Sequence, residues 1–123
     1  MLNLDTHMAV AVLSGDLTSH EFKLVSAEPL AFSSIVLWEL AKLVQLDRLS
    51  LDLESAAFRL FLGHVLVFPI TLEIAVRSTQ LDFRSDPADE IIAATSVVER
   101  IPLLTRDRKL LRSKMVPLAR ARR

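Results

Sequence analysis

Short apolar runs alternate with longer segments of helical character along this chain, and that alternation restricts the possible folds more than any other feature. We expect strands at residues 1–4, 30–32, 65–68 and 102–105. Helices are expected between and beside them, at residues 6–13, 17–26, 35–46, 72–79 and 87–99. Strands that alternate with helices form parallel β-α-β units, with helices on both faces of the sheet. The sequence therefore predicts a single three-layer α/β domain over residues 1–123, a short parallel sheet flanked by helices.

Two further elements are expected from weaker patterns. Asp52 or Ser50 can cap a helix that ends at Gly63. The side chains expected on the buried side of this helix are Ala56, Ala57, Leu60 and Phe61. Residues 115–116, Met-Val, are expected to form a last edge strand.

The composition excludes several classes of protein. The chain has no cysteine, so disulfide scaffolds, thiolate metal sites and cysteine nucleophiles are excluded. Its longest apolar runs, residues 8–13 and 65–70, fall far short of the roughly 20 residues that a membrane helix needs. No basic region precedes the first apolar stretch, so a cleaved signal peptide is not expected. These features favour a cytoplasmic protein.

The net charge of zero hides an asymmetry between the two ends of the chain. From residue 100 onward there are nine basic side chains and one acidic one, Asp107, whereas the first 99 residues carry a net charge of −8. A basic region of this kind favours contact with a polyanion such as nucleic acid. For residues 120–123 a solvated tail is the simpler interpretation. Arg106 and Arg108, however, flank the one acid of this region and are candidate substrate contacts.

Acidic residues stand where a parallel sheet would bind a ligand, which is outside the carboxyl ends of its strands. Asp5 closes the first expected strand, Asp107 follows the last, and Asp89 lies in the first turn of the helix that leads to it. Glu39 lies inside a helix among apolar neighbours, where an unpaired carboxylate is costly to bury. Converging carboxylates would repel one another unless a divalent cation held them, and oxygen ligands favour Mg²⁺ or Mn²⁺.

Each acid also has a purely structural interpretation. Asp5 and Asp107 can cap the helices that follow them. Asp86, followed by Pro87, is typical of a helix start with a capping side chain and proline at the first helical position. Asp89 would then lie favourably at the positive end of that helix. Spacing in one sequence does not decide between capping and metal binding.

Four segments of the chain stand out: MLNLDTH at residues 1–7, SSIVLWEL at 33–40, DPADEIIAAT at 86–95 and LLTRD at 103–107. Together they resemble the PIN-domain ribonucleases, and in particular the VapC toxins of toxin–antitoxin pairs. The resemblance spans essentially the whole chain. It implies a compact α/β domain with Mg²⁺- or Mn²⁺-dependent endoribonuclease activity. It also implies a homodimer and neutralisation by a cognate VapB-like antitoxin.

The resemblance also assigns residues. The acids that it places in the catalytic metal site are Asp5, Glu39, Asp89 and Asp107, with Asp86 as a possible ligand through water. Thr6 and Thr105 lie beside these acids and could hydrogen-bond a ligand carboxylate or a water, although a structural role is as plausible. Trp38 is expected in the core or in a dimer interface rather than as a base-stacking platform.

Two other functions remain open on the sequence. The first is a non-catalytic nucleic-acid- or protein-binding module on the same fold, in which the acids are caps and the basic C-terminal region binds the partner. The second is a hydrolase of small phosphoesters, which fits the acids but lacks a glycine-rich phosphate-binding loop, since the chain has only two glycines. Metal dependence of RNA cleavage separates the ribonuclease from the binding module.

Overall fold

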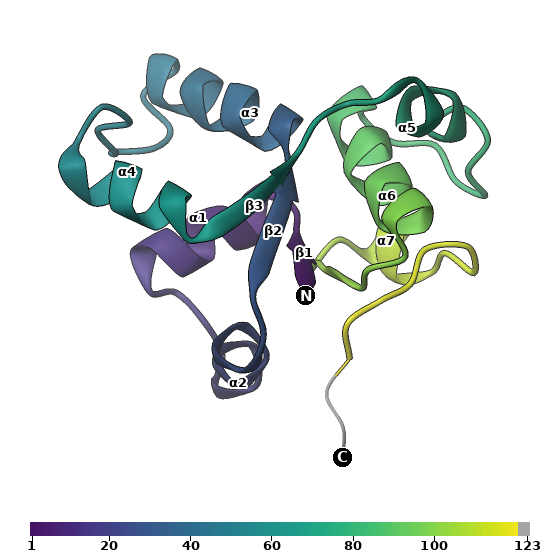
Figure 1. Ribbon diagram of the computed structural model, residues 1–123, viewed down its shortest axis with the longest axis horizontal. Coiled ribbons are helices and arrows are strands. Elements are labelled where there is room, and N and C mark those ends of the chain that lie inside the picture. The colour runs from purple at the N-terminus through teal and green to yellow at the C-terminus, as the bar shows by residue number, and fades with distance from the viewer. Residues whose placement is uncertain (121–123) are drawn as a thin grey trace.

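The fold is built around a parallel sheet whose strands are too short to stand without helices on both sides. The computed structural model describes residues 1–120 (Figure 1). Its elements in chain order are β1 (Leu2–Leu4), α1 (Thr6–Ser14), α2 (Ser19–Ala27), β2 (Leu30–Ser33), α3 (Ser34–Gln45), α4 (Ala56–Gly63), β3 (Val65–Phe68), α5 (Leu72–Arg77), α6 (Pro87–Glu99), β4 (Leu103–Leu104) and α7 (Arg108–Leu111). The expected alternation of strands and helices is confirmed.

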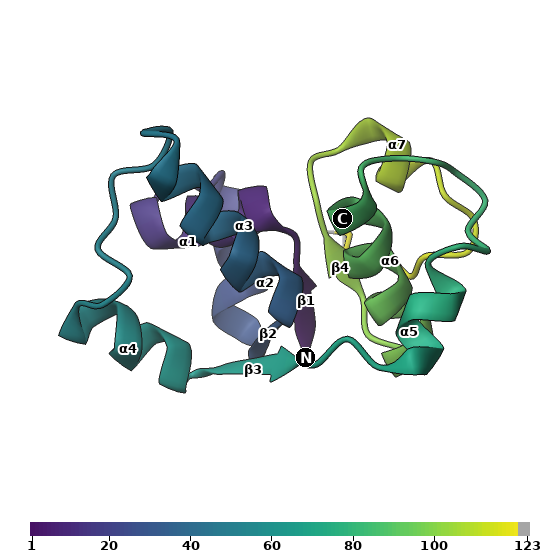
Figure 2. The same ribbon diagram turned by 90° about the horizontal axis from the view of Figure 1, so that it is seen from above.

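The sheet has the order β3-β2-β1-β4, and every neighbouring pair of strands is parallel. β1 lies in the interior, with Leu2 opposite Leu30 of β2 and Leu4 opposite Leu104 of β4. Because the strands are parallel, the residues that follow β1, β2 and β4 leave the sheet at the same edge. Figures 1 and 2 both place α1, α3 and α4 on one side of the sheet and α5, α6 and α7 on the other. The three-layer α/β architecture predicted from the sequence is therefore confirmed.

The core lies where the central strands meet α1, α3 and α6. The largest fully buried apolar side chains include Phe32, Leu2, Leu4, Met8, Leu40 and Ile92. β1 is buried at every residue, as expected of an interior strand of a parallel sheet. α3 turns Val36 and Leu40 into this core, four residues apart on one helix face. No helix within residues 1–120 is long and apolar enough to cross a membrane.

The prediction for α4 is wrong in its cap and in its buried face. Ser55, not Asp52 or Ser50, caps the helix, by accepting a hydrogen bond from the Phe58 backbone N–H at 3.1 Å. Phe58 is buried, whereas the expected inward residues Ala56, Ala57 and Leu60 are exposed. Phe58 and Phe61 stand three residues apart on one face, with ring centroids 6.1 Å apart. The larger aromatic pair thus sets the rotation of the helix and turns Leu60 toward solvent.

The strand expected at residues 115–116 is also wrong. The Ser113 hydroxyl accepts hydrogen bonds from the backbone N–H groups of Met115 and Val116, both at 3.1 Å. These donors are therefore used inside a turn and are not available to a sheet. The chain meets the sheet slightly later, where Leu118 forms a parallel bridge with Leu103.

Truncation of Phe32 should test how strongly this core supports the fold. Phe32 is fully buried in β2, so Phe32→Ala removes its burial and leaves a cavity, which costs about 3–5 kcal/mol. Leu60→Ala is the matched control, because Leu60 is 68% exposed and its replacement should change stability by less than about 0.5 kcal/mol. Urea unfolding followed by circular dichroism measures both. Equal effects of the two substitutions would contradict this account of the core.

Candidate active site

A pocket of about 470 Å³ opens at the edge of the sheet where β1 and β4 end. Four separate parts of the chain line it, namely the start of α1, the middle and C-terminal end of α3, the start of α6 and the loop between β4 and α7. The lining residues are Asp5, Thr6, His7, Trp38, Glu39, Lys42, Leu43, Leu46, Asp86, Asp89, Arg106 and Asp107. All five acids singled out in the sequence therefore lie around one cavity.

Asp5 is the most buried of these acids, with 6% of its surface exposed. One carboxylate oxygen accepts a hydrogen bond from the Met8 backbone N–H at 2.9 Å, which makes Asp5 the N-cap of α1. The other oxygen accepts a hydrogen bond from the Thr105 hydroxyl. Burial raises the pKa of Asp5, and the nearby Asp89 adds to that rise, while the two hydrogen bonds oppose it. Asp5 thus caps a helix and lines the pocket at the same time.

Glu39 points from α3 into the pocket and is half-buried. The Thr6 hydroxyl donates a hydrogen bond to its Oε1 atom. Burial raises the pKa of Glu39, and repulsion from Asp89 and Asp5 raises it further. Glu39 caps no helix, so the structural alternative that explains Asp5 does not explain it.

Asp89 and Asp107 complete the acidic side of the pocket. Asp89, in the first turn of α6, accepts a hydrogen bond from the Ser85 hydroxyl at 3.0 Å. Burial raises the pKa of Asp89, and repulsion from Asp107 and Asp86 raises it further. Asp107 caps α7 by accepting a hydrogen bond from the Lys109 N–H at 2.8 Å. Ser85 is a site residue that the sequence did not reveal, because serine in a polar loop has no distinguishing pattern.

Asp86 occupies the N-cap position of α6 ahead of Pro87, as expected, but its side chain makes no capping hydrogen bond. The prediction that the Asp86 side chain caps this helix is therefore wrong. Glu90 reaches back instead and accepts a hydrogen bond from the Ser85 backbone N–H at 3.2 Å. The Asp86 carboxylate lines the pocket, so its replacement would remove no capping bond.

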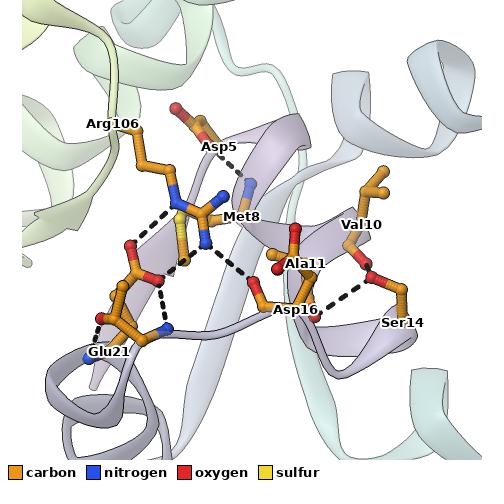
Figure 3. Close-up of polar contacts among 9 residues, drawn as sticks. Asp5, Met8, Val10, Ala11, Ser14, Asp16, Glu21 and Arg106 are labelled. Carbon is orange, nitrogen blue, oxygen red and sulfur yellow. Dashed lines mark hydrogen bonds and ion pairs between the residues drawn. The ribbon is translucent and has the colours of Figure 1, made fainter.

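The two candidate arginines lie in different environments. Arg106 lines the pocket, and Figure 3 shows its guanidinium reaching to the carboxylate of Glu21 and to the backbone oxygen of Asp16. Its Nε and Nη2 atoms lie 2.9 and 2.7 Å from the Glu21 carboxylate oxygens, and Nη2 lies 2.8 Å from the Asp16 oxygen. The hydrogen bonds from Arg106 are the main reason that the pKa of Glu21 falls to about 2. Arg108 is exposed on α7 and is not among the residues that line the pocket.

The donor set of the pocket fits a hard divalent cation. Its acids offer carboxylate oxygens, the ligand type that Mg²⁺ and Mn²⁺ take. Burial is the main cause of the raised pKa values of Asp5, Glu39 and Asp89, and repulsion between acids of the pocket adds to the rise. A bound cation relieves such repulsion. In the arrangement described here, no three His, Cys, Asp or Glu side chains of residues 1–120 are grouped closely enough to hold a metal ion. The fit of the pocket to a divalent cation therefore rests on the ligand chemistry of its carboxylates, not on their spacing.

The fold and the acidic pocket at the carboxyl edge of the sheet can now be compared with known protein families. The PIN domain model matches residues 3–114. The chain therefore belongs to the PIN domain family, which confirms the family inferred from the sequence motifs. A sequence search of curated proteins finds no match.

Solved structures share this fold over nearly the whole chain. FitAcB from Neisseria gonorrhoeae is 22% identical, with a TM-score of 0.71 and coverage of 98% of this chain and 97% of that one. VapBC2 from Rickettsia felis, bound to a DNA fragment from its promoter, is 20% identical, with a TM-score of 0.69 and coverage of 97% and 98%. DNA-bound VapBC from Salmonella typhimurium is 17% identical, with a TM-score of 0.71 and coverage of 96% of each chain. At these identities the likeness establishes the fold.

Removal of one charge from the pocket should stabilise the metal-free protein. The pKa of Asp89 is raised, so its contribution to stability is present below its unfolded pKa of 3.8 and is lost as the pH rises through the folded value. We therefore expect Asp89→Asn to raise Tm in EDTA at pH 7, and the gain to vanish at about pH 3, where the wild-type carboxyl is also neutral. Scanning calorimetry at both pH values measures this.

Asp82→Asn is the matched control for Asp89→Asn. Asp82 is exposed, and hydrogen bonds from Ser113 and Lys114 lower its pKa, so neutralising it should not raise Tm at pH 7. A rise of Tm at pH 7 in both variants would show that the effect is not specific to the pocket. A fall in Tm for Asp89→Asn would contradict the repulsion inferred there.

Proposed function

We propose that this chain is a metal-dependent endoribonuclease that hydrolyses RNA phosphodiester bonds, acting as the toxin of a VapBC-type toxin–antitoxin pair in the cytoplasm. The observation that carries the proposal is the convergence of acids from separate segments of a PIN domain on one pocket. The residues proposed to hold Mg²⁺ or Mn²⁺ are Asp5, Glu39, Asp89 and Asp107, with Asp86 reaching the ion through water.

The side chains around the acids support this chemistry. A bound divalent cation would supply an activated water and offset the charge of the phosphodiester. Thr105 and the Met8 N–H fix both oxygens of Asp5, and Thr6 orients Glu39. Ser85 orients Asp89 in the same way. These hydrogen bonds favour the ionised form of the carboxylates and orient them, as the groups that support metal ligands do.

Arg106 is proposed to meet the RNA backbone at the pocket. An acidic pocket alone repels a phosphodiester, and a guanidinium next to it attracts one. The ion pair with Glu21 offsets part of this attraction, but it also holds the Arg106 guanidinium in one position beside the pocket. Arg108 can contact only RNA that extends over α7, because it does not line the pocket.

The alternative is a non-catalytic binding module in which the acids serve only as helix caps. Asp5 and Asp107 do cap helices. Glu39 lies within a helix, Asp89 lies in the first turn of one, and the Asp86 side chain makes no capping bond, so capping accounts for none of these three. The arrangement of those three acids favours the enzyme over the binding module.

Neutralising the acids one at a time should abolish cleavage while leaving the fold intact. Asp5→Asn, Glu39→Gln and Asp89→Asn should each lower the rate by more than about 100-fold, because even residues that merely support metal ligands cost about 10–100-fold. Asp107→Asn should be milder, since an amide oxygen can still orient a water or a neighbouring ligand. The assay is digestion of labelled total RNA with Mg²⁺ or with EDTA.

The matched control is Glu54→Gln, an exposed acid outside the pocket, which should cut at the wild-type rate. Circular dichroism verifies that each variant is folded. A folded Asp5→Asn protein that cuts RNA as fast as the wild type would contradict the proposed site. Cleavage that persists in EDTA would contradict the metal dependence.

We further infer that the free chain forms a homodimer and that a VapB-like antitoxin covers the acidic pocket. Several large apolar side chains remain exposed within residues 1–120, including Leu72 at 80% and Val76 at 48% on α5. Exposed apolar surface of this kind is typical of interaction sites. The structural neighbours described as toxin–antitoxin or VapBC complexes also support a protein partner. An arginine of the partner placed among the acids would replace the cation electrostatically.

Sedimentation equilibrium of the purified chain tests the dimer. We expect a species of twice the chain mass of 13.8 kDa at micromolar concentration. Leu72→Lys, which places a charge at the most exposed of these apolar positions, should shift the protein toward monomer if that surface is the interface. A wild-type protein that is strictly monomeric across the concentration range would contradict the inference.

A further inference from the structure

The pocket has a second wall that the proposed metal chemistry does not use. Lys42, Leu43, Leu46 and Trp38 line this wall, and all of them belong to α3 or to its C-cap. Trp38, Lys42 and Leu46 are spaced four residues apart, so they form one row along the helix. Trp38 is 56% exposed and Leu46 is 58% exposed. A large aromatic side chain thus stands open beside a cluster of acids.

Trp38 is not in the core, which corrects one of the two places expected for it. The core face of α3 carries Val36 and Leu40, and Trp38 lies midway between them in sequence, on the opposite side of the helix. The next residue, Glu39, turns into the same pocket. The helix therefore places an indole ring directly beside a proposed metal ligand.

Lys42 adds a positive charge to this wall. Its Nζ atom lies 5.9 Å from the centre of the Trp38 ring and donates a hydrogen bond to Gln45 at 3.0 Å. Within residues 1–120 Lys42 forms no ion pair, whereas Arg106 across the pocket is paired with Glu21. Lys42 is thus a cation that no ion pair among the described residues holds, and it lies next to an exposed aromatic ring.

We propose that Trp38 stacks against an unpaired base of the RNA and that Lys42 contacts the phosphate attached to it. The proposal rests on the proposed ribonuclease function. An aromatic face for a base, a cation for its phosphate and acids for the neighbouring phosphodiester are the groups that a single-stranded nucleotide requires, and one pocket holds all of them. A base within a duplex offers no free face, so the pocket selects unpaired RNA.

The sequence supplies a direct probe of this contact. Trp38 is the only tryptophan and the chain has no tyrosine, so intrinsic fluorescence excited at the indole band reports on this wall alone. A catalytically inactive Asp5→Asn protein is titrated with a mixed-sequence single-stranded RNA of about 12 nucleotides. The same strand annealed to its complement and a single strand of equal length with abasic sites are titrated alongside. We expect quenching by the intact single strand and little change with the duplex or the abasic strand.

Substitutions measure how much affinity the ring contributes. Stacking of a base on an aromatic side chain corresponds to about 5–150-fold in Kd. Trp38→Leu, which keeps an apolar side chain without an aromatic face, should therefore weaken binding of labelled RNA by that factor, measured by fluorescence anisotropy in the Asp5→Asn background. Trp38→Phe should recover most of the loss. Leu60→Ala, on an exposed position outside the pocket, is the matched control and should bind as the parent does.

Three results would overturn the proposal. The first is an unchanged Kd for folded Trp38→Leu, and the second is equal quenching by the abasic strand, which would show that phosphate alone is bound. The third is a Trp38→Leu variant that loses dimerisation but binds RNA normally, because Trp38 would then be a subunit contact.

Failure of the base site is distinguishable from failure of the proposed enzyme. RNA cleavage by the wild-type chain that depends on Mg²⁺, with no quenching in the inactive variant, overturns the base site alone. Quenching by single-stranded RNA without any metal-dependent cleavage supports the base site and overturns the enzyme.

Discussion

The burial of several carboxylates side by side at one edge of the sheet is the constraint on which the rest of this site depends. Burial raises the pKa values of Asp5, Glu39 and Asp89; repulsion from Asp89 raises those of Asp5 and Glu39 further, and repulsion from Asp107 and Asp86 raises that of Asp89. Each is met by a hydroxyl donor, from Thr105, Thr6 and Ser85 respectively. These hydroxyls stabilise the ionised form without introducing an opposing charge. The site thus keeps a net negative field that a cation, or a cationic side chain of a partner, can occupy.

The fold tolerates this repulsion because the acids are attached to elements whose other faces are deeply buried. Asp5 follows β1, which is buried at every residue, and Glu39 lies on the helix that buries Val36 and Leu40. Asp89 lies in the first turn of α6, which packs Ile92 and Ala93 into the same core. Hydrophobic burial on one side of each element therefore holds like charges together on the other. Stability and the acidic pocket are properties of the same three elements.

Most of the architecture could be predicted from the sequence, because strand and helix periodicity and the acids at strand ends are local patterns. The buried face of α4 could not be predicted, since choosing Phe58 over Leu60 depends on which side chain reaches the core. The prediction of a strand at residues 115–116 was wrong for a related reason. The backbone N–H groups of this segment donate hydrogen bonds to the Ser113 side chain and are not available to a sheet. Glu21 was missed because its partner Arg106 lies 85 residues away, and such pairing leaves no local signal.

α3 shows how one helix can serve three purposes in this fold. Its inner row, Val36 and Leu40, belongs to the core, and the surface beside and opposite that row lines the pocket. Within that surface Glu39 and Leu43 form one row, and Trp38, Lys42 and Leu46 form the next. Consecutive residues of a helix are turned by about 100° from each other. The acid Glu39 and the aromatic ring of Trp38 can therefore face one cavity only when the helix lies along the wall of that cavity. That placement of α3 joins the proposed metal chemistry to the proposed recognition of an unpaired base, because moving either row would displace the other.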